Sequence, residues 1–122
     1  MAYLPDIKKN ILANKSFDFS IRIVDLYRFL IKKNEYVLSK QILRSGTAIG
    51  ALITEAQNAE SKKDFIHKLG ISQKECSETI YWLNVLLKGK YINTKQFQSI
   101  SNDTEELLKM LRSSIMTAKK SL

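Results

Sequence analysis

The chain has 122 residues, 44% of them hydrophobic, which is enough for one domain with a core and too few for two. Its formal net charge of +8 favours an anionic partner, and nucleic acid ranks before a membrane because no basic amphipathic segment stands alone. The single cysteine, Cys76, excludes an intramolecular disulfide and the usual multi-cysteine zinc sites. The amino-terminal segment lacks the apolar stretch of a signal peptide, so we expect a cytoplasmic protein.

The composition indicates an all-α fold, because proline and glycine are scarce and no run alternates β-branched with polar residues. Helices are expected over residues 16–33, 36–60, 62–88 and 94–119, and residues 1–15 are expected to form an N-terminal arm. The connections are too short for crossovers, so consecutive helices must run antiparallel. The sequence therefore predicts a single up-down-up-down four-helix-bundle domain over residues 16–122.

The first helix, with Ser16 as its candidate N-cap, carries two apolar stripes at helical spacing. The stripe that we assign to the core consists of Phe17, Ile21, Val24 and Ile31. The other stripe consists of Phe19, Ile23, Leu26 and Leu30. A helix at the edge of a monomeric bundle needs only one stripe, so the second is expected to pack against another copy of the chain. A wide core helix is the alternative.

The second helix is the stretch around which the rest of the chain is expected to pack. Its core stripe consists of Leu38, Ile42, Ser45, Ile49, Leu52, Ala56 and Ala59. Gly46 and Gly50 would each cost about 1 kcal/mol relative to alanine inside a helix, so a compensating contact is expected. We predict that a neighbouring helix comes unusually close at these two glycines.

The third helix begins at a capping-box pattern, Ser61 to Asp64, and is expected to end at Gly89 in the left-handed conformation. Its core stripe consists of Phe65, Leu69, Ser72, Cys76, Ile80, Leu83 and Leu87. Beside it lies a second stripe, of which Ile71, Trp82 and Leu86 are expected at a subunit interface. The fourth helix, capped by Asn93 or Thr94, has a single core stripe that consists of Phe97, Ile100, Thr104, Leu107, Leu111, Ile115 and Ala118.

Lysines gather at one end of the predicted bundle, where the first and third loops lie. They are Lys32, Lys33, Lys40, Lys88, Lys90 and Lys95, and Glu35 is the one acidic residue counted with them. The opposite end is more balanced in charge. Lysines without interleaved aromatic residues suit phosphate contact better than base readout, so we predict that this end binds nucleic acid.

No pattern of catalytic or metal-binding residues emerges. Bundles that hold two metals need Glu-x-x-His motifs, whereas this chain has Glu75-x-x-Glu78 and a single histidine, His67. We therefore expect no metal and no cofactor. The carboxylates of Glu55, Glu75 and Glu78 are instead expected to form buried ion pairs with Arg22 or Arg44. Cys76 lies on the core stripe and is expected to be a small hydrophobic residue rather than a nucleophile.

Three stretches closely resemble a known family of four-helix bundles. They are the LRSGTAIGALITEA run from Leu43 to Ala56, the SKKDF segment from Ser61 to Phe65, and the ECSETIYWL stretch from Glu75 to Leu83. The first helix also matches, so the resemblance covers about residues 15–88. The family is named for proteins encoded in intervening sequences of bacterial 23S ribosomal RNA genes.

The resemblance implies a cytoplasmic bacterial protein that forms a ring of five bundles and has no assigned enzymatic activity. Relatives include the accessory protein of diversity-generating retroelements, a basic pentamer that binds nucleic acid and a reverse transcriptase. The leading hypothesis is therefore a non-enzymatic, oligomeric RNA- or DNA-binding bundle. The alternative is a scaffold for a protein partner such as a polymerase, in which the basic end meets an acidic protein surface.

Overall fold

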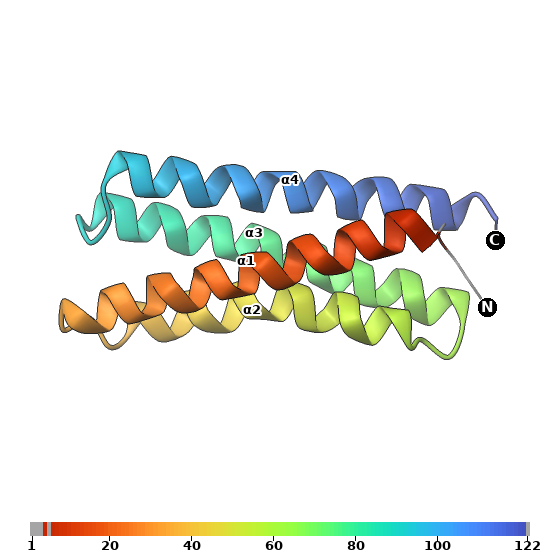
Figure 1. Ribbon diagram of the computed structural model, residues 1–122, viewed down its shortest axis with the longest axis horizontal. Coiled ribbons are helices and arrows are strands. Elements are labelled where there is room, and N and C mark those ends of the chain that lie inside the picture. Colours follow the sequence, from red (N-terminus) through yellow and green to blue (C-terminus); the bar gives the residue numbers. More distant parts are fainter. Residues whose placement is uncertain (1–3, 5, 122) are drawn as a thin grey trace.

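The computed structural model describes residue 4 and residues 6–121, and these form four helices without any strand. The helices are α1 (Asp6–Lys32), α2 (Leu38–Gln57), α3 (Lys62–Lys88) and α4 (Thr94–Lys119). They run up, down, up and down, and each packs against its two neighbours around the bundle (Figure 1). The all-α prediction is confirmed. Over the described residues, no helix is both long and apolar enough to cross a membrane.

Two helices begin where their capping residues predict. The Ser61 hydroxyl accepts a hydrogen bond from the Asp64 amide at 3.0 Å, which starts α3. At α4, the Asn93 side chain accepts from the Gln96 amide at 2.8 Å, while the Gln96 side chain accepts from the Asn93 amide at 2.9 Å. This reciprocal pair is a capping box, and it satisfies two backbone donors that the helix leaves unpaired.

The expected arm is wrong, because α1 already begins at Asp6. Lys8 donates from Nζ to the Ser113 and Thr117 hydroxyls of α4 at 3.0 and 3.1 Å, and Leu12 is buried. Asparagine costs under about 0.7 kcal/mol per helical position, whereas burying a leucine contributes about 1.5–3 kcal/mol, so the helix continues through this segment. Ser16 is not a cap, since its hydroxyl donates to the Ala13 carbonyl within the helix at 3.0 Å. Residues 1–3 and 5 of the expected arm lie outside the described part of the chain.

The two stripes of α1 are exchanged relative to the prediction. Phe19, expected at a subunit interface, is only 2% exposed, whereas Phe17 and Ile21, expected in the core, are 65% and 49% exposed. Extending the helix explains this result. With Leu12 and Ser16 included, spacings of four and three residues continue without a break, and this longer stripe fills the core. Its members are Leu12, Ser16, Phe19, Ile23, Leu26 and Leu30, all buried within the single chain.

Helix α3 shows a smaller shift of the same kind. Leu86, expected at a subunit interface, is buried in the core, as is Thr79. Leu87 and Ile80, expected in the core, are only half-buried. Ile71 and Trp82 are also half-buried. In α2, similarly, Ile53 takes the buried position that was expected for Leu52.

Helix α1 packs closely against the two glycines of α2. A Cβ atom added at Gly46 would lie 2.7 Å from Cγ1 of Ile23, and one at Gly50 would lie 3.1 Å from the Ser16 carbonyl oxygen. Both neighbours belong to α1, so α1 packs into the notch that the glycines leave. On the other side of α2, Ser72 of α3 donates to the Ile49 carbonyl at 2.9 Å. Small residues thus bring α2 close to both of its neighbours.

Candidate nucleic-acid interface

The topology brings the lysine-rich end together. The α1–α2 and α3–α4 connections lie at the same end of the bundle, opposite the start of α1 and the end of α4 (Figure 1). The residues of this end, which we call the lysine end, are Lys32, Lys33, Lys40, Lys88, Lys90 and Lys95, and all are exposed. Lys33 links the two connections directly, because its Nζ donates to the Tyr91 carbonyl at 3.2 Å and lies 4.7 Å from the centre of the Phe29 ring.

Glu35, the acidic residue at this end, does not neutralise the lysines. It is buried, and its carboxylate accepts from the Ser39 amide at 2.6 Å and from the Val37 amide at 3.2 Å. Burial opposes ionisation, but the backbone donors at the start of α2 outweigh it and hold the pKa of Glu35 below its ordinary value. The negative charge therefore serves the positive end of α2 rather than an ammonium group.

The lysine end is also uncompensated by ion pairs. In the described part of the chain, none of its six lysines pairs with a carboxylate, although cations elsewhere do. Lys15 pairs with Glu106, for example, and Arg22 with Asp103 at 2.5 Å. The hydrogen bond that Lys15 donates to Glu106 raises the pKa of Lys15 by more than desolvation lowers it. Exposed cations without partners are the groups that a polyanion can contact without first breaking a pair.

Lys90 holds an unusual backbone conformation for a lysine. Helix α3 ends in a left-handed residue, but this residue is Lys90 with φ of 67° rather than the expected Gly89, which has φ of −77°. The Tyr91 amide donates to the Leu86 carbonyl and the Lys90 amide to the Leu87 carbonyl, a pattern that needs the left-handed residue at position 90. Gly89 has little room for a side chain, since a Cβ there would lie 3.0 Å from the Val85 carbonyl oxygen.

A hollow, which the sequence did not predict, lies beside the lysine end. It has a volume of about 510 Å³ and lies between the end of α1 and the α3–α4 connection. Phe29, Leu87 and Ile92 give it an apolar lining, and Lys33 and Lys90 also line it. Phe29 belongs to neither apolar stripe of α1, so periodicity gave no signal for it. The hollow exists because α1 lies close to α4 near the termini and diverges from it toward the loops (Figure 1).

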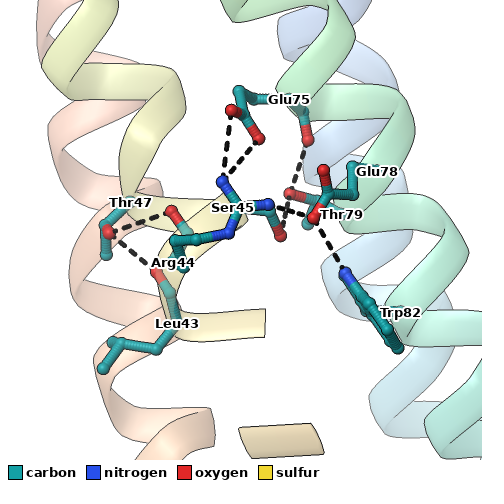
Figure 2. A network of polar contacts seen from close by, with 8 residues as sticks. All are labelled: Leu43, Arg44, Ser45, Thr47, Glu75, Glu78, Thr79 and Trp82. Carbon is teal, nitrogen blue, oxygen red and sulfur yellow. Dashed lines mark hydrogen bonds and ion pairs between the residues drawn. The ribbon is translucent and has the colours of Figure 1, made fainter. Parts of the chain in front are cut away.

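The expected ion pairs form in part, and at the surface rather than in the interior. Arg44 of α2 contacts Glu75 at 3.3 Å and also Glu78, while Trp82 donates to Glu78 at 3.0 Å (Figure 2). Hydrogen bonds from Trp82 and then Arg44 hold the pKa of Glu78 below its ordinary value. The Arg44 side chain is 50% exposed, so this network is not buried.

The remaining expected carboxylate partners differ from the prediction. Arg22 pairs with Asp103 of α4, and Glu55 pairs with Lys68 at 3.2 Å, so neither takes the partner inferred from sequence. Neither pair is buried. Arg22 lines the surface groove beside α4, and the Lys68 and Glu55 side chains are 30% and 55% exposed. These contacts tie neighbouring helices together at their edges and present no convergent set of carboxylates.

The chemistry of the described residues offers no activated nucleophile or metal cluster. Burial raises the pKa of the Cys76 thiol to about 12, which removes thiolate character at neutral pH. His67 is exposed on α3. No three His, Cys, Asp or Glu side chains gather over residues 4 and 6–121. The arrangement that this fold builds is therefore a charged, hollowed surface.

The chain is similar to one known protein family and to a solved structure. Residues 8–113 match the model of the family described as 23S rRNA-intervening sequence protein. The crystal structure of a protein of unknown function from the S23 ribosomal protein family, from Bacteroides thetaiotaomicron, is also similar. It shares 52% identity, covers 89% of this chain and 98% of its own length, and superposes with a TM-score of 0.88. No curated protein matches the chain significantly.

Proposed function

The chain belongs to the family of 23S rRNA-intervening sequence proteins, and from that premise we propose that it is a non-enzymatic, oligomeric RNA-binding protein of the cytoplasm. The observation that carries the proposal is the lysine end, where six exposed lysines share one end of the bundle without carboxylate partners among the described residues. Neutralising phosphates with these groups would release counterions, so binding gains free energy that depends on salt.

The second part of the proposal is that copies of the chain associate. Phe17 and Ile21 lie one helical turn apart on the face of α1 that points away from the core, at 65% and 49% exposure, and neighbouring exposed apolar side chains support an interaction site. The family resemblance implies five copies in a ring. A ring would combine several lysine ends into one positive surface and so strengthen phosphate binding. The interface residues are then those that remain outside the core, rather than the Phe19 stripe.

A salt titration with matched lysine variants tests the RNA-binding proposal. One variant replaces Lys88, Lys90 and Lys95 by glutamine; the control replaces three exposed lysines of the opposite end, Lys63, Lys119 and Lys120. Both variants lose the same charge, so a difference between them reports position. If the three lysines of the lysine end contact phosphate, the slope of log affinity against log salt falls by roughly 2. Equal slopes for the two variants would contradict the proposal.

Association is tested separately by light scattering over a concentration series. The wild-type chain is expected to be larger than a monomer, and the double variant F17E/I21K is expected to be monomeric with an unchanged helical spectrum, because neither side chain contributes to the core. A monomeric wild-type chain at micromolar concentration would refute this part. Salt-independent affinity for RNA would instead favour the second candidate, a scaffold whose basic end meets an acidic protein partner.

A further inference from the structure

We infer that the hollow beside the lysine end receives an unpaired base, so that the protein binds single-stranded nucleic acid more tightly than duplex; this inference rests on the proposed RNA-binding function. The hollow has a volume of about 510 Å³ and is open to solvent, so a flat group presented at the surface has room to enter it. Its apolar lining of Phe29, Leu87 and Ile92 has no use in contacting a phosphate backbone alone.

Charge and shape together select the occupant. Lys33 and Lys90 line the same hollow as the apolar side chains, so a ligand must combine an anionic part with a flat or apolar part. A nucleotide has that combination. In a duplex its base is stacked inside and only the phosphates are presented, whereas an unpaired base is free to leave the strand and contact an aromatic ring.

The polar lining adds hydrogen-bond donors that suit the edge of a base. Asn93 and Gln96 use their side-chain oxygens to accept from each other's backbone amides. An amide oxygen must face each N–H donor, so the side-chain NH₂ groups of both residues are left to donate elsewhere. Both residues line the hollow together with Thr94. Carbonyl and ring-nitrogen acceptors on a base therefore meet a donor-rich wall.

Lys33 lies where the phosphate contact and the base contact of the proposed site meet. Its ammonium group lies 4.7 Å from the centre of the Phe29 ring and spends one hydrogen bond on the Tyr91 carbonyl. An ammonium group has three donors, so capacity for a phosphate oxygen remains. Lys33 therefore brings a phosphate-binding group to the edge of the hollow in which the Phe29 ring lies.

The test compares one RNA strand with its own duplex, in the wild-type protein and two variants. Phe29→Leu keeps an apolar side chain but removes the aromatic ring from the hollow, and Phe97→Leu is the matched control, a half-buried phenylalanine that does not line it. Affinities are measured by fluorescence anisotropy at one salt concentration. The wild-type protein is expected to prefer the single strand. F29L is expected to weaken single-strand binding roughly 5- to 100-fold, the range for losing one base stack, while duplex binding stays unchanged.

The outcomes separate this inference from the function on which it rests. Equal affinity for strand and duplex, or equal losses in F29L and F97L, would overturn the base pocket while leaving salt-dependent RNA binding in place. Absence of any salt-dependent binding would overturn both. Should F29L fail to fold, ultraviolet crosslinking of the wild-type protein to an oligouridine decides the question. Crosslinks to the peptides that carry Phe29 or Ile92 support the pocket, and crosslinks confined to other helices refute it.

Discussion

The left-handed lysine at the end of α3 gives a prediction in which stability and binding change in opposite directions. A residue with a Cβ pays roughly 1–2 kcal/mol for the left-handed conformation, and Lys90 adopts it with φ of 67°. Glycine avoids that cost but loses about 0.5–1 kcal/mol more in backbone entropy on folding. We therefore expect Lys90→Gly to raise the free energy of unfolding by about 0.5–1 kcal/mol, or the melting temperature by about 2–5 °C.

The same substitution should weaken RNA binding. Removing one phosphate contact lowers the slope of log affinity against log salt by about 0.7–0.9. Unfolding is followed by circular dichroism in urea and binding by anisotropy across a salt series. A gain in stability with a loss of affinity would indicate that the chain keeps a strained lysine at this position for its charge, since strained residues concentrate at functional sites.

Two control variants isolate the backbone effect. Lys88→Gln removes a like charge from the same end at an ordinary helical position, so its stability should change by less than about 0.5 kcal/mol. Asn34→Gly relieves the equivalent left-handed residue after α1, where φ is 63°, but asparagine tolerates this conformation and the gain should be smaller. If K90G is no more stable than K88Q, then charge rather than conformation explains the effect and the reasoning is refuted.

Three further predictions concern the helix contacts. Gly46→Ala should destabilise the chain by about 1–2 kcal/mol, because the clash of the new methyl group with Ile23 outweighs the gain in helix propensity. Gly70→Ala, which has open space around it, should stabilise the chain by about 1 kcal/mol. Urea unfolding of both variants measures the sign of each change. Cys76 should resist a thiol reagent at pH 8 until guanidinium unfolds the chain, and rapid native labelling would contradict its burial. The pKa of Glu35 is lower in the folded chain than in the unfolded chain, where it is near 4.5. Its carboxylate therefore stabilises the fold fully above the unfolded pKa, and this contribution is lost as the pH falls through the folded pKa. The free energy of unfolding should accordingly differ less between pH 7 and pH 3 in Glu35→Gln than in the wild-type chain.

Local capping chemistry explains which parts of the fold were predictable. The third and fourth helices start where expected because Ser61 and Asn93 cap them with their own side chains. Ser16 resembles such a cap in sequence, but its hydroxyl bonds inside α1, which already begins at Asp6. A serine before an apolar run is compatible with both roles, so only the burial of Leu12 distinguishes them.

The lysines of the candidate site were predictable from the sequence, whereas the hollow and the role of Glu35 were not. Six lysines at one end follow from an up-down topology with short loops, which the sequence fixes without knowledge of packing. The hollow depends instead on how α1 and α4 diverge toward the loops (Figure 1), which the residue pattern of either helix does not reveal. Glu35 was counted against the lysines because its sequence position gives its charge but not its hydrogen bonds.

Because the two α1 stripes are exchanged, the apolar surface proposed for association is the Phe17 side of α1 rather than the Phe19 side. The surplus of apolar residues is real, because Phe17 and Ile21 remain exposed after the core is filled. Helix α3 lies diagonally across the bundle from α1 and exposes Tyr81 beside the half-buried Trp82. Two unlike apolar faces on opposite sides of one chain support the proposal of head-to-tail contacts rather than a two-fold dimer, and such contacts form a ring when the rotation between subunits closes. In a ring with the bundle axes parallel, all lysine ends would point the same way, whereas an antiparallel dimer would separate them.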